Sequence, residues 1–188
     1  DGAAPFYLFS AGGEISPQYE WYKDYFLSVE AYRGLNALEN HLHVADFQVA
    51  LSVGESLTIV ATTEESPDTD GISAYTRQRS YEQELITRSQ LKEALPAVQH
   101  LVLAADQFVV RRSTVENPEG HSTIAGYPWF GDWGRDTMIS LPGLTLSTQR
   151  HDVARSILWT YSRYVDQGML PNRFPEVGQT PEYNTVDA

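Results

Sequence analysis

The sequence contains no cysteine and is poor in basic residues. Without cysteine, the 188 residues exclude disulfide bonds and thiolate metal sites. The 13 Lys and Arg are outnumbered by 25 Asp and Glu, which gives a formal net charge of -12. An acidic surface repels phosphate backbones and anionic lipid, so nucleic acid and membranes are poor candidate partners. A neutral ligand such as a sugar fits this charge better.

Long apolar runs and nucleotide-binding motifs are also missing. No run approaches membrane-spanning length, and no basic-then-apolar leader is visible at the start. Together with the absence of cysteine, this favours a cytoplasmic protein. A P-loop, a Rossmann fingerprint and a nucleophile elbow are not found, and we expect no cofactor and no metal ion.

The residues that are present indicate a globular chain of mixed structure. The hydrophobic content of 41% is ordinary for a protein with a core, and the length allows one large domain or two small ones. Changes in pattern divide the chain into a β-rich segment (1–63), a polar linker (64–78) and a helical segment (79–188). The expected fold class is therefore α+β.

Alternation of apolar and polar residues predicts strands in the β-rich segment. Residues 47–53 and 57–61 alternate in this way, and Gly54 to Ser56 between them predicts a hairpin turn. The aromatic-rich stretch 21–29 is also strand-like.

A helical period begins after the linker. Residues 81–94 predict one helix. Pro96 suits the first turn of a second helix, in whose last turn Arg111 and Arg112 would complement the helix dipole.

Two further helices are predicted closer to the C-terminus. Residues 137–148 are apolar nearly all round, which predicts a helix buried on every side, with a kink at Pro142. The helix after it is amphipathic, with Asp152 as its cap and Gly168 at its end. Its predicted buried stripe consists of Val153, Ile157, Tyr161, Tyr164 and Val165. A buried helix followed by an amphipathic one is typical of nested inner and outer helical layers.

Residues 126–136 (GYPWFGDWGRD) carry the strongest functional signal. A sugar ring needs an aromatic face for its C–H groups and fixed donors and acceptors for its hydroxyls. A turn that only buries aromatic rings would explain Trp129 and Trp133, but not the charges of Asp132, Arg135 and Asp136 beside them.

A simpler interpretation of two of these charges stays open. If a helix begins near Arg135, Asp136 lies at its N-terminus, where a carboxylate is electrostatically favoured. Asp136 would then be only a cap and Arg135 only an ion-pair partner. The flanking tryptophans favour a binding site.

Two other groups of residues are less informative. The loop 168–175 (GMLPNRFP) offers an amide and a guanidinium group that could line a pocket or merely connect helices. His41 and His43 share one face of a strand, but no third ligand is evident, so we expect a structural role rather than a metal site.

Four segments together resemble the amylo-α-1,6-glucosidase region of glycogen debranching enzymes. They are residues 104–110 (AADQFVV), 126–144 (GYPWFGDWGRDTMISLPGL), 168–174 (GMLPNRF) and 182–188 (EYNTVDA). Residues 1–95 resemble the β-rich segment that precedes this region in bacterial and archaeal forms. The resemblance implies a β-sandwich-like segment followed by the first helices of an (α/α)6 barrel.

The resemblance also implies a reaction and residues that serve it. The reaction is hydrolysis of α-1,6-linked glucose at branch points of glycogen or limit dextrin, with inversion at the anomeric carbon. Asp187 is the implied general acid, with a pKa raised so that its carboxyl is protonated near neutral pH. The implied substrate-binding residues are Trp129, Asp132, Trp133, Arg135, Asp136, Asn172 and Asn184.

An inverting enzyme needs a second carboxyl group as the general base. In the family this base lies well downstream of the segment that holds Asp187, and no residue here corresponds to it. We therefore expect the chain to be a fragment that is inactive by itself. Three alternatives stay open: a hydrolase of the glucoamylase or trehalase type, a carbohydrate-binding module without catalysis, and a purely structural helical domain.

Overall fold

The computed structural model describes residues 5–114, 117–127, 130–173 and 181–184. The chain forms two compact units, an N-terminal unit (Asp1–Thr76) and a C-terminal unit (Arg77–Ala188). Among the described residues, no helix has the length and apolar character that crossing a membrane requires.

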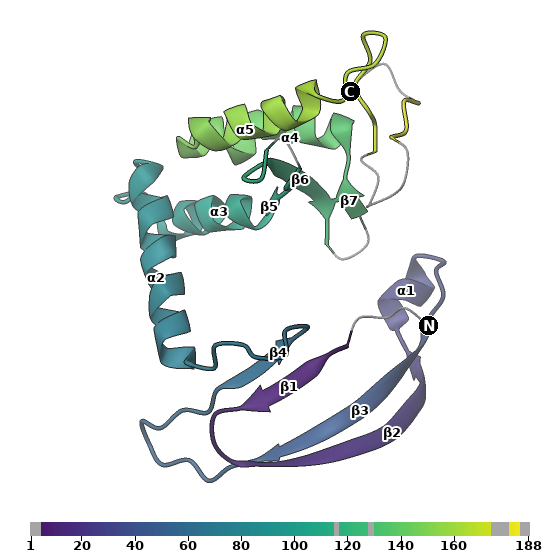
Figure 1. Ribbon diagram of the computed structural model, residues 1–188, viewed down its shortest axis with the longest axis vertical. Helices are drawn as coiled ribbons and strands as arrows, with labels where there is room; N and C mark the ends of the chain where they lie inside the picture. The colour runs from purple at the N-terminus through teal and green to yellow at the C-terminus, as the bar shows by residue number, and fades with distance from the viewer. Residues whose placement is uncertain (1–4, 115–116, 128–129, 174–180, 185–188) are drawn as a thin grey trace. The chain divides into compact units, whose positions relative to one another are not determined.

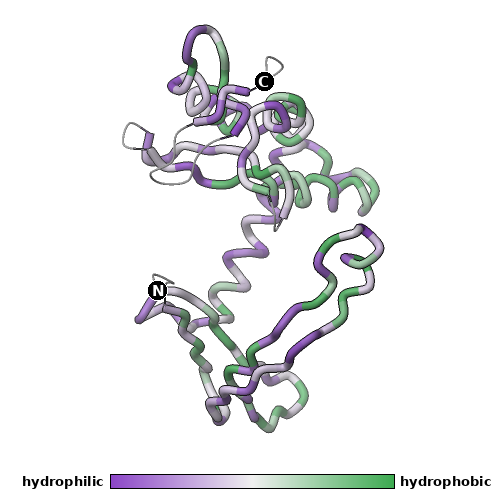
Figure 2. Tube along the Cα trace, turned by 90° about the vertical axis from the view of Figure 1, so that its right-hand side faces the viewer, coloured by the Kyte–Doolittle hydropathy of each residue, from purple (hydrophilic) through white to green (hydrophobic). Residues whose placement is uncertain are grey.

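Two antiparallel strand pairs make up the N-terminal unit. Strand β2 (Glu14–Phe26) pairs with β3 (Leu38–Gln48) as a long ribbon, and the short helix α1 (Ser28–Tyr32) lies in the connection between them. Strand β1 (Tyr7–Ser10) pairs with β4 (Ile59–Thr62) (Figure 1). Hydrophobic and hydrophilic stretches are interspersed along the ribbon (Figure 2). The strand predicted at 21–29 is confirmed as far as Phe26.

The hairpin predicted between residues 47–53 and 57–61 is wrong. Strand β3 ends at Gln48 and pairs with β2, while β4 pairs with β1. Between them Glu55 closes a turn, because its N–H donates to the Ser52 carbonyl at 3.0 Å and its carboxylate accepts from the Ser52 N–H at 2.8 Å. Alternation identifies a strand but does not identify its partner, and here each partner comes from far along the sequence.

Helix α2 (Gly71–Arg88) begins inside the expected linker and ends before residue 94. Its start has a physical cause, because the Asp70 carboxylate accepts hydrogen bonds from the Ser73 N–H at 3.0 Å and the Ser73 hydroxyl at 2.6 Å. This is the geometry of an N-cap side chain bonding to the third residue of a helix.

A three-stranded antiparallel sheet and further helices build the C-terminal unit. The strands lie in the order β5-β6-β7. The elements are α3 (Pro96–Gln107), β5 (Val109–Arg111), β6 (His121–Gly126), β7 (Phe130–Asp132), α4 (Gly134–Leu144), the 3-10 helix η1 (Leu146–Thr148) and α5 (His151–Ser162). Strand β6 pairs with β5 on one edge and with β7 on the other, and both α4 and α5 contact it.

Helix α3 confirms Pro96 as a first-turn residue but contradicts the predicted helix end. The helix stops at Gln107, and Arg111 belongs to β5. Val109 and Val110 pair with Thr123 and Ser122 of β6, because β-branched residues favour a strand once a partner strand is available.

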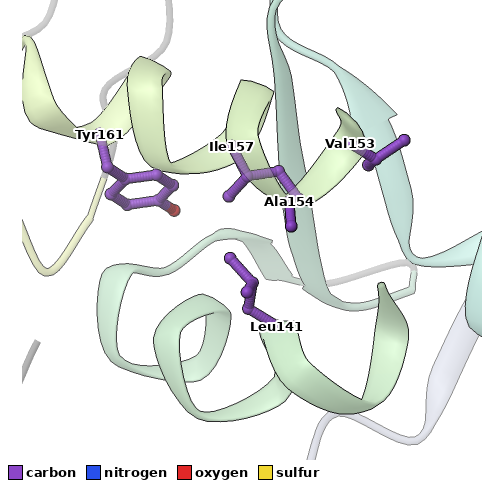
Figure 3. Packing of buried hydrophobic residues seen from close by; sticks show 5 residues of the cluster. All are labelled: Leu141, Val153, Ala154, Ile157 and Tyr161. Atoms are coloured by element: carbon purple, nitrogen blue, oxygen red, sulfur yellow. The ribbon is translucent and has the colours of Figure 1, made fainter. Parts of the chain in front are cut away.

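Helix α4 begins before residue 137 and is not buried on every side. Thr137 and Leu141 are buried, whereas Ile139 is 73% exposed. Helix α5 buries Val153, Ile157 and Tyr161 of the predicted stripe, and Ile157 and Tyr161 extend to the side of α5 that faces Leu141 of α4 (Figure 3). Tyr164 and Val165, the last two residues of that stripe, lie beyond the end of the helix. The apolar composition of this segment therefore predicted more burial than α4 has, because the described residues cover only some of its sides.

The predicted ends of α5 were also wrong. Arg150 is the N-cap residue and Asp152 lies in the first turn, where its carboxylate bonds to Arg88 of α2. The helix ends at Ser162, well before Gly168. Gly168, with φ of 85°, lies instead in a turn closed by two backbone hydrogen bonds between Asp166 and Met169.

Candidate functional site

The segment with the strongest sequence signal forms a corner between β7 and α4. Trp133 is extended (φ -113°, ψ 132°) and serves as the N-cap residue, and α4 begins at Gly134. Arg135 and Asp136 therefore occupy the first turn of the helix with exposed side chains. The predicted position of Asp136 at a helix N-terminus is confirmed, and a negative charge is favoured there.

A pocket opens at this corner. It has a volume of about 250 Å³ and is lined by Ala125, Phe130, Trp133, Arg135 and Asp136, and we name it the corner pocket. Its lining combines two aromatic rings with one cation and one anion. It therefore gathers three of the residues that the sequence predicts to bind a sugar.

A second, more apolar pocket adjoins the first, because both include Ala125 and Asp136. Its volume is about 340 Å³. The remaining residues that line it are Phe108, Thr123, Ile124, Ile139, Ser140 and Leu144. Among the described residues, Asp136 is the only charged one in this lining, and because it lines both pockets its side chain lies where they meet.

Asp132 takes a different orientation from its neighbours in the sequence. It is buried, it does not line either pocket, and its Oδ2 atom lies 3.5 Å from Nε of Arg112. The sequence did not identify Arg112 as part of this region, because nothing about its position next to Arg111 indicated an ion pair with Asp132 of β7.

A ladder of backbone contacts joins the corner to the two later segments. Trp133 pairs with Arg173, and Arg173 pairs with Glu182. The Gly134 N–H donates to the Asn172 carbonyl, and the Asn172 N–H donates to the Glu182 carbonyl, both at 2.8 Å. We call this set of contacts the corner ladder, and it gathers three of the segments named in the sequence analysis.

The corner ladder also brings two predicted binding residues together. The Asn172 side-chain amide donates to the Asn184 side-chain oxygen at 2.8 Å. Trp129 and Asp187, the other predicted site residues, lie outside the described residues.

A group of buried hydroxyls lies beneath the corner. The Tyr161 hydroxyl is 3.0 Å from Oγ1 of Thr137 in α4 and 3.5 Å from Oγ of Ser122 in β6. Burial raises the pKa of the Tyr161 phenol, although the bonds to Ser122 and Thr137 act in the opposite direction. Sequence reasoning placed Tyr161 in an apolar stripe and had no signal for these bonds.

The histidine pair in β3 forms no metal site with other described residues. Among these residues, no group of three or more potential ligands is close enough to hold a metal ion. Nε2 of His41 lies 3.4 Å from Glu39, and Nε2 of His43 lies 2.9 Å from Asp46. Each histidine thus has a local acidic neighbour, in keeping with a structural role.

Comparison with known proteins gives two family matches. Residues 103–188 match the family described as amylo-alpha-1,6-glucosidase, and residues 1–58 match the glycogen debranching enzyme N-terminal family. The glycogen debranching enzyme of Saccharomyces cerevisiae is 34% identical over 99 residues, which cover 48% of this chain and 6% of the yeast protein. No solved structure matches the chain. Both family matches and the yeast relative concern glycogen debranching enzymes, so the chain is similar to two regions of this kind of protein and spans only a small part of the yeast protein's length.

Proposed function

We propose that the chain is part of a glycoside hydrolase that releases α-1,6-linked glucose from branch points of glycogen or limit dextrin. The observation that carries this proposal is the corner pocket, where Trp133, Arg135 and Asp136 meet. The match of residues 103–188 to amylo-alpha-1,6-glucosidases supports the same substrate class.

The chemistry of the corner pocket suits one glucose unit. The rings of Trp133 and Phe130 offer apolar surfaces for the C–H face of the sugar. The Arg135 guanidinium donates hydrogen bonds, and the Asp136 carboxylate accepts them from hydroxyl groups. A neutral sugar also suits a chain with a net charge of -12.

The proposed fold of the whole enzyme is an (α/α)6 barrel behind a β-sandwich-like segment. In this arrangement α4 would be an inner helix and α5 an outer one. The single buried stripe of α5 supports its position as an outer helix, because only one of its faces needs a partner. We place the enzyme in the cytoplasm, with branched α-glucan rather than nucleic acid or membrane as its partner.

Asp187 is the proposed general acid. Its segment is joined to the corner pocket through the corner ladder, which runs from Trp133 through Arg173 to Glu182. The Asp187 carboxyl would protonate the departing glycosidic oxygen, while a second carboxylate deprotonates the water that attacks the anomeric carbon from the opposite face. No residue of this chain is assigned to that second role.

The test is an Asp187→Asn variant of the full-length enzyme. We expect glucose release from limit dextrin to fall by about 10²–10⁴-fold, because the amide has no acidic proton to donate, while oligosaccharide binding is retained. Asp166→Asn, which changes an exposed carboxylate on a turn, is the matched control. Near-normal turnover by Asp187→Asn would remove this residue as the acid.

Substrate choice is tested with the unmodified full-length enzyme. We expect glucose from limit dextrin and little from linear maltooligosaccharides or trehalose. A preference for either of the latter would assign the chain to a hydrolase of the glucoamylase or trehalase type. Sugar binding without any hydrolysis would indicate a carbohydrate-binding module.

A further inference from the structure

A buried ion pair lies beneath the corner pocket. The side chain of Asp132 is 9% exposed and that of Arg112 is 27% exposed. Asp132 ends β7, while Arg112 directly follows β5, and β6 lies between these two strands. The pair therefore joins the two outer strands of the sheet across the central one.

The ion pair shares one face of the sheet with the buried hydroxyls. Asp132 lies opposite Ile124, and the Arg112 N–H donates to the Gly120 carbonyl at 2.7 Å. Ser122 of β6 lies midway between Gly120, which precedes the strand, and Ile124, and on the same face, because side chains alternate along a strand. The Ser122 hydroxyl approaches the Tyr161 hydroxyl of α5, and the charges of Asp132 and Arg112 both act on the pKa of this phenol, so hydroxyls from β6 and α5 lie near the ion pair.

The inward direction of Asp132 determines the direction of Trp133. A buried carboxylate is strongly unfavourable without its counter-ion, so Arg112, which directly follows β5, holds Asp132 toward the interior. Because the backbone at Trp133 is extended, successive side chains point to opposite faces, and Trp133 lines the corner pocket. Arg135 and Asp136 follow in the first turn of α4, for which Trp133 is the N-cap residue.

We propose that Asp132 and Arg112 are positioning residues for the sugar site. Their ion pair fixes β7 so that Trp133, Arg135 and Asp136 face the corner pocket, and Asp132 itself does not contact the sugar. The role in sugar binding rests on the proposed function, whereas the effect on the orientation of Trp133 does not.

The test uses the 188-residue chain labelled with 5-fluorotryptophan and observed by ¹⁹F NMR without ligand. The Trp133 line is assigned by its loss in Trp133→Phe. In Asp132→Asn, which keeps the shape and removes the charge, we expect the Trp133 line to shift or broaden while the Trp21 line stays in place. Asp132→Glu, which restores the charge, should recover part of the original line.

The matched control is Glu119→Gln. Glu119 also pairs with an arginine, Arg111, at 2.6 Å, but both side chains are largely exposed. We expect this variant to leave the Trp133 line unchanged. If Asp132→Asn does not fold, Asp132→Glu is compared directly with the unmodified chain. Because it keeps the charge but displaces the carboxylate, we expect a small shift of the Trp133 line, and an unmoved line would overturn the proposal.

Addition of isomaltose, an α-1,6-linked glucose disaccharide, gives the second measurement. We expect Asp132→Asn to weaken binding by roughly 10- to 100-fold, as for other residues that orient ligand-binding groups. Weaker binding with an unmoved Trp133 line would make Asp132 a direct sugar contact and overturn the proposal. An unmoved line with unchanged affinity would overturn it as well.

The ligand-free spectra separate this proposal from the proposed function. If the unmodified chain does not respond to isomaltose, the sugar-binding role of the corner pocket fails. A displaced Trp133 line in Asp132→Asn would still establish the positioning role of the ion pair.

Discussion

Arg135 is the residue whose chemistry is most specific for the corner pocket. It is the only cation that the described part of the chain contributes to the pocket lining, and its planar guanidinium suits hydroxyl and carboxylate oxygens. Asp136 beside it lies at the helix end that favours an anion. Binding to this site should therefore depend on individual side chains more than on pocket volume.

We predict that Arg135→Ala weakens oligosaccharide binding to the full-length enzyme by roughly 10- to 100-fold. A hydrogen bond to a charged group contributes about 1.5–3 kcal/mol, which corresponds to that range. Calorimetric titration measures the change. Arg155→Ala, which removes an exposed arginine from α5, should bind as the unmodified enzyme does. Equal affinity in both variants would remove Arg135 from the site.

The Tyr161 phenol predicts a loss of stability in alkaline solution. Burial raises its pKa above the ordinary value of 10.0, so the folded state keeps the proton that the unfolded state releases. The contribution to stability is complete below about pH 10 and is lost as the pH rises toward the folded-state pKa.

Urea unfolding at about pH 8 and about pH 11 tests this prediction. Tyr161→Phe should lose less stability between the two pH values than the unmodified chain does. Tyr32→Phe is the control, because this ring is 92% exposed. An equal loss in all three proteins would contradict the assignment.

Residue chemistry allowed part of the site to be predicted. Trp133, Arg135 and Asp136 stood out because a turn that only buries aromatic rings does not explain the charges beside them. The inward direction of Asp132 and its pairing with Arg112 could not be predicted, because they depend on which strands become neighbours. That neighbourhood is a property of the folded sheet and not of the local sequence.

At the scale of elements, α5 is the helix that covers the core of the C-terminal unit. Ile157 is fully buried against α4, while Leu158, the next residue, is 48% exposed. These two residues of similar size allow burial to be tested apart from helix propensity.

We predict that Ile157→Ala lowers the free energy of unfolding by about 2–5 kcal/mol, through lost apolar burial and the cavity left behind. Leu158→Ala should cost much less, because its side chain already contacts water. Chemical denaturation of the 188-residue chain measures both. Equal losses would show that α5 does not pack on α4 through this face.

The predicted elements were correct where local signals and long-range packing agreed. Pro96 identified the start of α3 because its ring suits a first turn in any context. The predicted end of α3 was wrong because Val109 and Val110 belong to β5, which pairs with β6. The start of α2 was not predicted, because it lies in a polar stretch. Asp70 caps the helix there, but a polar residue of this kind also occurs in loops.

At the scale of the molecule, the family matches fall on two compact units. Residues 1–58 lie in the N-terminal unit and residues 103–188 in the C-terminal unit. The alignment covers only 6% of the yeast relative, which is therefore a much longer chain.

We predict that the 188-residue chain alone releases no glucose from limit dextrin, whereas the full-length enzyme does. Inversion requires two carboxyl groups about 6.5–9.5 Å apart, and only the acid is assigned within this chain. An enzymatic glucose assay with both proteins checks the difference. Glucose release by the short chain would show that the second carboxylate lies within its own sequence.

The corner ladder has a consequence for how such enzymes tolerate changes in length. Arg173 and Glu182 are paired, so the chain leaves and re-enters the site at adjacent points. Closing a longer loop across a fixed base costs little additional entropy, about 0.6 kcal/mol for each doubling. We therefore expect that extra residues inserted between these two positions would leave the pairing of Arg173 with Glu182 intact.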